Sequence, residues 1–172
     1  DKQNTHKRER QAAKYYNRVL VEACCNKDSL LSQQTPSSKD CLVIGITEED
    51  DFTSKYGKEL AKRFLIGKCC ALWFSSPCTG GSPWQHINIH RGPKTAERIK
   101  NQWFTFRKLW KAFEEVATHA ILYDCAVFVG WPRGCAYWKD KAVVRFLGKH
   151  GFSNCHFDGC MYGLVATKGA EQ

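Results

Sequence analysis

The segment FSSPCTGGS, residues 74–82, contains the residue best placed for covalent chemistry. Cys78 follows a proline at the end of an apolar run, and two glycines come shortly after it. A cysteine in such a turn is expected to be exposed, and its thiolate can attack an electrophilic carbon. We therefore predict Cys78 as a nucleophile. A cysteine that only fills a tight loop is the alternative interpretation.

A second group of residues suits a polyanion. Residues 91–111 hold seven Lys or Arg and one Glu, and the whole chain has a net charge of +9. Aromatic residues alternate with these cations, and this mixture can hold phosphates and stack bases. The alternative is a helix with a solvated basic face and a buried aromatic face.

We predict that basic and aromatic side chains contact DNA or RNA. They are Trp84, Lys100, Arg107, Lys108, Lys111 and Arg133. Trp131 is a further candidate for stacking on a base displaced from its helix.

Apolar runs predict the strands that position these residues. They cover residues 18–25, 41–47, 69–75, 121–129 and, in a shorter run, 154–157. Helical spacing of apolar residues predicts helices at 54–66, 93–118 and 139–147. Strands alternating with helices predict a Rossmann-like α/β fold, with a mostly parallel sheet and crossover helices.

The chain of 172 residues is expected to form one domain. We place a basic N-terminal arm at 1–17, the α/β domain at 18–164 and a loose tail at 165–172. No run approaches the roughly 20 apolar residues of a membrane span, so no membrane contact is expected. The polar start DKQNTHKRERQ is unlike a secretory signal. These features predict an intracellular protein, nuclear or cytoplasmic.

Ten cysteines are scattered through the chain, several of them in apolar runs. Without a signal for export, we expect reduced and mostly buried thiols. No CxxC pair occurs, which argues against the common zinc frameworks, and we assign no metal ligands. A zinc-stabilised domain that uses His86, His90, Cys155 and Cys160 is a remaining alternative.

The most unusual segments follow the predicted strands. They are ACC, EEDD, SPCTGG and GWPRG. Ligands of parallel α/β sheets bind at the carboxyl ends of the strands, so these segments predict a ligand site.

In their order, these segments resemble the DNA cytosine-5 methyltransferases, especially the short relatives associated with phages and retroelements. FSSPCTGGS is similar to the family's Pro-Cys loop, which implies that Cys78 adds to C6 of cytosine. EEDDF resembles the acidic pair that contacts the adenine of S-adenosylmethionine (SAM), and FDGCMYG resembles the end of the catalytic domain. The resemblance implies SAM as cofactor, held by Glu22, Ala23, Cys24, Glu48, Asp51, Ser76 and Pro77.

Two departures from the family bear on catalysis. The first cofactor loop of the family is rich in glycine, whereas residues 23–26 here are ACCN. The Glu that holds the cytosine ring in the family aligns with Gly130, so its activating hydrogen bond is absent.

Two functions therefore stay open. One is a SAM-dependent methyltransferase acting on nucleic acid through Cys78. The other is a non-catalytic module of methyltransferase shape, part of a mobile-element or viral polyprotein, that serves nucleic-acid binding or assembly.

Overall fold

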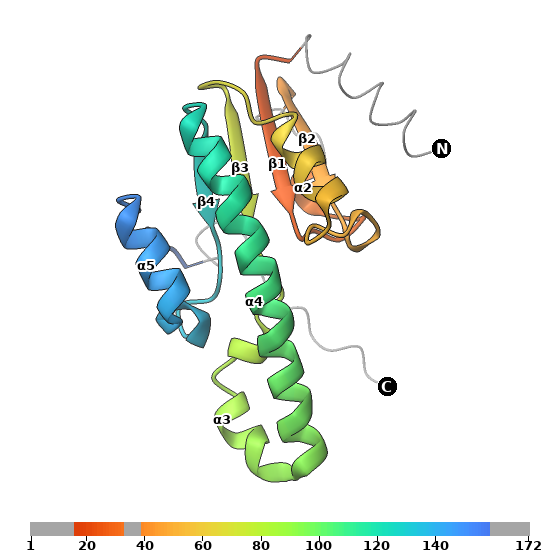
Figure 1. The fold of residues 1–172 in the computed structure, drawn as a ribbon, viewed down its shortest axis with the longest axis vertical. Coiled ribbons are helices and arrows are strands. Elements are labelled where there is room, and N and C mark those ends of the chain that lie inside the picture. Colours follow the sequence, from red (N-terminus) through yellow and green to blue (C-terminus); the bar gives the residue numbers. More distant parts are fainter. Residues whose placement is uncertain (1–15, 33–38, 159–172) are drawn as a thin grey trace.

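The computed structural model describes residues 16–32 and 39–158, which form a single sheet with helices packed on it (Figure 1). The strands are β1 (Arg18–Ala23), β2 (Cys41–Ile46), β3 (Cys70–Phe74) and β4 (Ala126–Val129). They are arranged in the order β2-β1-β3-β4, and each neighbouring pair is parallel. This confirms the predicted Rossmann-like α/β fold class.

The main helices begin where the sequence supplies a suitable first residue. They are α2 (Lys55–Lys62), α3 (Gln85–Asn88), α4 (Pro93–Leu122) and α5 (Lys141–Lys149). The Ser54 hydroxyl accepts a hydrogen bond from the Gly57 amide, and the Asp140 carboxylate accepts one from Ala142. Pro93 occupies the first turn of α4, where its missing amide hydrogen leaves no bond unmade.

Short 3₁₀ helices complete the description. They are η1 (Leu30–Ser32), η2 (Glu48–Asp50), η3 (Thr79–Gly81), η4 (Ile89–Arg91) and η5 (Ala136–Lys139).

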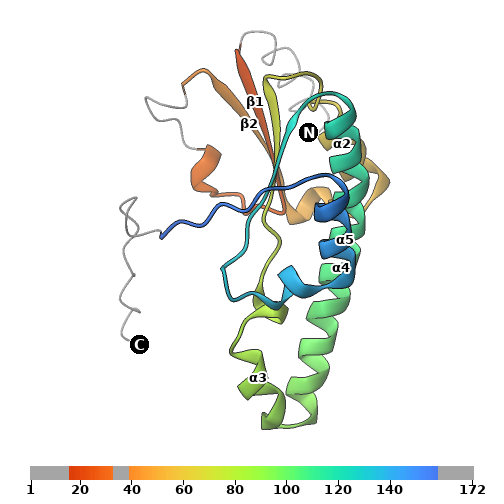
Figure 2. The same cartoon turned by 90° about the vertical axis from the view of Figure 1, so that its left-hand side faces the viewer.

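The helices α2, α4 and α5 cover the same face of the sheet (Figures 1 and 2). Alternate strand residues face them and are buried, as Val21, Ile44 and Leu72 illustrate. The residues between these point to the opposite face, where Trp73 is half-buried and Phe128 is 48% exposed. The sheet therefore has one fully buried face and one more open face.

Aromatic rings fill the space between the sheet and α4. The Phe74 ring of β3 stacks on Phe113 with their centroids 4.6 Å apart, and the Phe106 ring stacks on Tyr137 at 3.6 Å. Trp110 contacts several of these rings and is 2% exposed. Rings of this kind contribute large buried areas, so α4 is anchored mainly by its central part.

Three predicted elements need correction. No strand forms at 154–157, because all four residues are exposed and no neighbouring strand pairs with them. The predicted strand at 121–129 begins only at Ala126, since the apolar spacing of α4 continues to Leu122. The helix predicted at 54–66 ends at Lys62, and Phe64 and Leu65 are buried in the turn that follows.

Most of the predicted N-terminal arm, 1–17, and the whole tail, 165–172, lie outside the described residues. The nine cysteines within the described residues are free thiols. Cys70 and Cys125 are buried as expected, whereas Cys69 is exposed.

Candidate functional site

The carboxyl ends of the four strands lie along one edge of the sheet. Along this edge, the side on which successive strands are added changes between β1 and β3. β1 is followed along the chain by β2 on one side, whereas β3 pairs with β1 on the other side. Ligands of open parallel sheets bind at such a switch point. Ala23 at the end of β1 accepts a hydrogen bond from the Ser75 amide, at 3.5 Å, so the segments after β1 and β3 lie side by side.

Carboxylates gather at the β1–β2 end of this edge. Most of them accept hydrogen bonds from residues of the adjoining loops. Glu22 is buried and accepts hydrogen bonds of 2.7 and 2.8 Å from the Ser29 hydroxyl. Asp51 accepts bonds from the amide and the hydroxyl of Thr53, at 3.0 and 2.7 Å. Glu48 is exposed. Two of the three predicted cofactor carboxylates thus already bind neighbours in their own segments.

The first loop follows a tight path without glycine. Cys24 adopts a φ of 66°, in the left-handed region that favours glycine, and its thiol packs against the core. Burial, together with the neighbouring Cys25, raises the pKa of Cys24 to about 12. Ala23 is fully buried. These side chains therefore serve the packing of the loop.

Tyr137 and Cys135 leave no room for side chains at the two glycines of the Cys78 loop. A Cβ atom on Gly80 would lie 2.6 Å from the Tyr137 hydroxyl oxygen, and one on Gly81 would lie 2.7 Å from the Cys135 sulfur. Burial raises the pKa of Tyr137 to about 12, so it remains a neutral phenol at neutral pH. Cys78 lies on a turn as predicted, but its side chain is half-buried and packs against the core.

The loop after β4 closes onto the same edge. The Trp131 indole donates to the carbonyl and the hydroxyl of Ser76, both at 3.2 Å, and Ser76 is buried. Trp131 contacts the rings of the core, so stacking on a base would require it to leave that cluster. A Cβ atom on Gly130 would lie 2.9 Å from the Trp73 ring, which explains a glycine at this position.

A basic projection dominates the β3–β4 end of the edge. We call residues 84–111 the basic arm: they include α3, η4 and the first half of α4, which extend beyond the strand ends (Figure 1). All seven of its Lys and Arg residues are exposed, and its only acidic residue is Glu97. Trp84 is 71% exposed and Phe104 is 60% exposed.

Most of the predicted polyanion contacts fall on the basic arm. Lys100, Lys108 and Lys111 lie on one exposed stripe of α4, and the Lys108 ammonium lies 4.5 Å from the centre of the Phe104 ring. Arg107 is held beside this stripe by Asp140, with 3.4 Å between Nε and Oδ2. Arg133 is exposed on the loop after β4.

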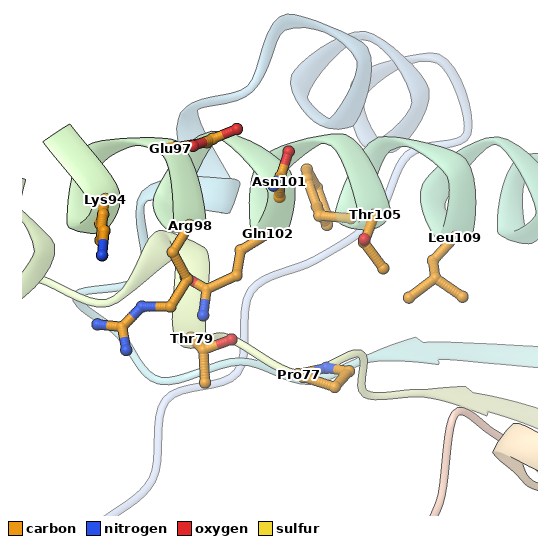
Figure 3. Close-up of a pocket in the computed structure, with 10 residues that line it drawn as sticks. Pro77, Thr79, Lys94, Glu97, Arg98, Asn101, Gln102, Thr105 and Leu109 are labelled. Atoms are coloured by element: carbon orange, nitrogen blue, oxygen red, sulfur yellow. The ribbon is translucent and has the colours of Figure 1, made fainter.

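A cavity of about 410 Å³ lies between the basic arm and the Cys78 loop (Figure 3). Pro77 and Thr79 form one wall, and α4 forms the other through eight side chains. Those of α4 are Lys94, Glu97, Arg98, Asn101, Gln102, Thr105, Phe106 and Leu109. Of the predicted cofactor residues, only Pro77 lines this cavity.

The sequence prediction missed Lys94, Arg98 and Asn101, although a signal for them exists. Positions 94, 98, 101 and 105 recur at spacings of four and three, which places polar residues on one side of a helix. The Cys78 turn was identified separately, and only the folded chain brings the two together.

Residues 16–32 and 39–158 contain no group of three or more His, Cys, Asp or Glu side chains arranged to hold a metal ion. His86 and His90 are exposed there, whereas Cys160 lies outside the described residues. None of the helices in the described part of the chain is long and apolar enough to cross a membrane.

No known family model matches this chain, and neither a curated protein nor a solved structure matches it. The fold and the site define the class: an α/β domain with a parallel sheet and a basic arm at its carboxyl edge.

Proposed function

We propose that this chain is a nucleic-acid-binding α/β domain and that the basic arm is its contact surface. The observation that carries the proposal is the exposure of all seven arm cations together with the rings of Trp84 and Phe104. Cations neutralise phosphates and release counterions, while exposed rings stack on bases.

The exposed rings favour a single strand over a duplex. Bases in a duplex are stacked on one another, so a side-chain ring gains access to a base face chiefly where the strand is unpaired. Phe104 lies among Lys100, Lys108 and Lys111, so a strand that follows these cations passes over the ring. Both DNA and RNA present these features, and the experiment compares them.

Fluorescence anisotropy with labelled single strands of DNA and RNA, at a series of salt concentrations, tests the proposal. The triple substitution Lys100→Gln, Lys108→Gln and Lys111→Gln is expected to make the negative slope of log K against log salt shallower by about 2, since each phosphate contact in a single strand contributes about −0.7.

The matched control removes three exposed cations far from the arm, with Arg63→Gln, Lys68→Gln and Lys149→Gln. It makes the same change in net charge and is expected to leave most of the slope intact. Equal losses in the two triple variants would show that net charge, and not the arm, determines binding. Binding that does not respond to salt would contradict the proposal.

A second candidate is methyl transfer from SAM to a base, with Cys78 as nucleophile. One observation favours it: Pro77 and Thr79, which flank Cys78, line the cavity beside the basic arm. Calorimetric titration with SAM and S-adenosylhomocysteine tests cofactor binding, and a methylation assay with Cys78→Ala tests the nucleophile. Methylation that persists in Cys78→Ala would exclude covalent attack by this thiol.

A further inference from the structure

We infer that the cavity between α4 and the Cys78 loop binds a single nucleoside monophosphate unit. The inference goes beyond the proposed function, because none of Lys100, Lys108 and Lys111 lines the cavity. Nucleotide binding in the cavity can therefore fail while strand binding at these three lysines persists, and the reverse can also occur.

The chemistry of the cavity changes in order along α4 (Figure 3). Lys94 and Arg98 lie at one end, together with the carboxylate of Glu97. The polar side chains of Asn101 and Gln102 come next, and Leu109 lies at the other end with Pro77 opposite. A nucleotide has the same order, from an anionic phosphate through a hydroxylated sugar to a flat base. Arg98 and Phe106 are eight residues apart, which is about 12 Å along a helix and comparable with the length of one nucleotide.

The cationic end suits a phosphate. Lys94 and Arg98 are four residues apart, so both lie on the same side of α4, and both are exposed. No ion pair within the described residues involves either side chain. A guanidinium donates two parallel hydrogen bonds to phosphate oxygens, and a lysine adds a point charge.

The middle of the cavity holds an unused acceptor. Gln102 Oε1 is buried and accepts no hydrogen bond from the described residues. The side chain is fixed at its base, because the Gln102 Cβ packs against Gly80 of the opposite wall. A buried acceptor without a donor is unfavourable. Rotation of the Gln102 amide toward the cavity would let a sugar hydroxyl supply that donor. The hydroxyl of Thr79 on the facing wall offers a second polar contact.

The far end of the cavity is apolar and suits a base. Phe106 is 2% exposed and closes this end, with Leu109 beside it and Pro77 across from it. The volume of about 410 Å³ falls within the range of small-ligand sites.

Two sources supply this chemistry: a free nucleotide, and the phosphorylated end of a nucleic-acid strand. Isothermal titration of the full chain with CMP, AMP, the two matching nucleosides and inorganic phosphate tests the site itself. The monophosphates are expected to bind at least about tenfold more tightly than the nucleosides, because charge-assisted hydrogen bonds are the stronger ones.

The advantage of the monophosphates is expected to disappear in Arg98→Gln and to shrink in Lys94→Gln. It is expected to persist in Lys149→Gln, which removes an exposed cation that does not line the cavity. Circular dichroism shows whether each variant keeps its fold, and the exposed positions of all three residues favour this. Equal affinity for nucleoside and monophosphate, or no effect of Arg98→Gln, would overturn the inference.

Single strands with a 5′-phosphate, a 3′-phosphate or no terminal phosphate distinguish the two sources. A gain in affinity on terminal phosphorylation that Arg98→Gln abolishes identifies the strand end as ligand; no gain, with CMP or AMP still bound, identifies the free nucleotide. A chain that binds strands in a salt-dependent way but no mononucleotide overturns this inference alone. A chain that binds mononucleotides but no strand overturns the proposed function alone.

Discussion

The hydroxyl oxygen of Tyr137 lies so close to Gly80 that a Cβ atom added to Gly80 would be 2.6 Å from this oxygen. The same position would place that Cβ 2.9 Å from the Cβ of Gln102 on α4. Gly80 is therefore held between η5 and α4, and this contact sets the distance between the two walls of the cavity.

Gly80→Ala is expected to lower the free energy of unfolding by about 1–3 kcal/mol, as other overpacked substitutions do. Urea denaturation measures the change. Gly148→Ala is the matched control, because a Cβ atom there meets nothing within 4 Å in the helix α5. The control should raise stability by up to about 1 kcal/mol, since glycine is unfavourable in helices. Equal stability of Gly80→Ala and the wild type would contradict the packing described.

Cys24 is expected to resist alkylation at about pH 8, whereas the exposed Cys69 reacts readily. The raised pKa of Cys24 leaves little thiolate, and its side chain is packed in the loop after β1. Iodoacetamide labelling followed by peptide mass spectrometry measures both rates in the same sample. Comparable rates for the two thiols would show that the first loop is open.

The same pKa links stability to alkaline pH. The folded chain holds the Cys24 proton more tightly than the unfolded chain, whose thiol has an ordinary pKa of 9.0. This contribution to stability is complete below pH 9.0 and is lost as the pH rises from there through about 12. Cys24→Ala should flatten this part of the curve of unfolding free energy against pH.

Asp140→Ala is expected to cost about 1 kcal/mol of stability, because the carboxylate caps α5 by accepting a 2.9 Å hydrogen bond from the Ala142 amide. Asp140→Asn preserves the cap and removes only the charge that faces Arg107. Since that pair lies at the surface, Asp140→Asn should change stability by less than about 1 kcal/mol. Thermal unfolding of both variants compares the two losses of stability. A larger loss of stability in Asp140→Asn than in Asp140→Ala would show that the ion pair with Arg107 matters more than the cap.

Phe104→Ala is expected to weaken binding of a single strand by about 1–3 kcal/mol, the usual contribution of one stacked base. Stability should change little, because the Phe104 ring is 60% exposed. Leu122→Ala is the control: it removes an apolar side chain that is 78% exposed at the opposite end of α4. Anisotropy titrations compare the two variants, and equal affinities would argue against stacking on Phe104.

The strands were predictable because buried parallel strands are nearly continuous apolar runs, such as CLVIGI in β2. The order of the strands in the sheet was not predictable, since it depends on which side of the preceding strand each connection places the next one. The end of α4 was missed because Val116, Ala117 and Ala120 continue the same apolar spacing into a segment that also suits a strand.

At the site, the sequence indicated which segments meet but not what their residues do there. Gly80 and Gly81 suggested an exposed turn around Cys78, whereas Tyr137 and Cys135 from a distant segment pack against these glycines. For the aromatic residues of 91–111, the sequence left open whether they stack on bases or pack in the core. Two residues along a helix turn by about 200°, which places the exposed Phe104 opposite the buried Phe106. A helical projection of residues 93–111 would have revealed both the exposed ring and the cavity face.

The helix α4 belongs to both the core and the basic arm, and this determines how the basic arm binds a ligand. The central rings of α4 are locked between the sheet and Tyr137, so its first half cannot reorient without repacking them. A rigid projection loses little conformational entropy when it binds, and it requires no folding step beforehand. We therefore expect a polyanion to encounter a surface that already has its bound shape, so that association depends on diffusion and charge.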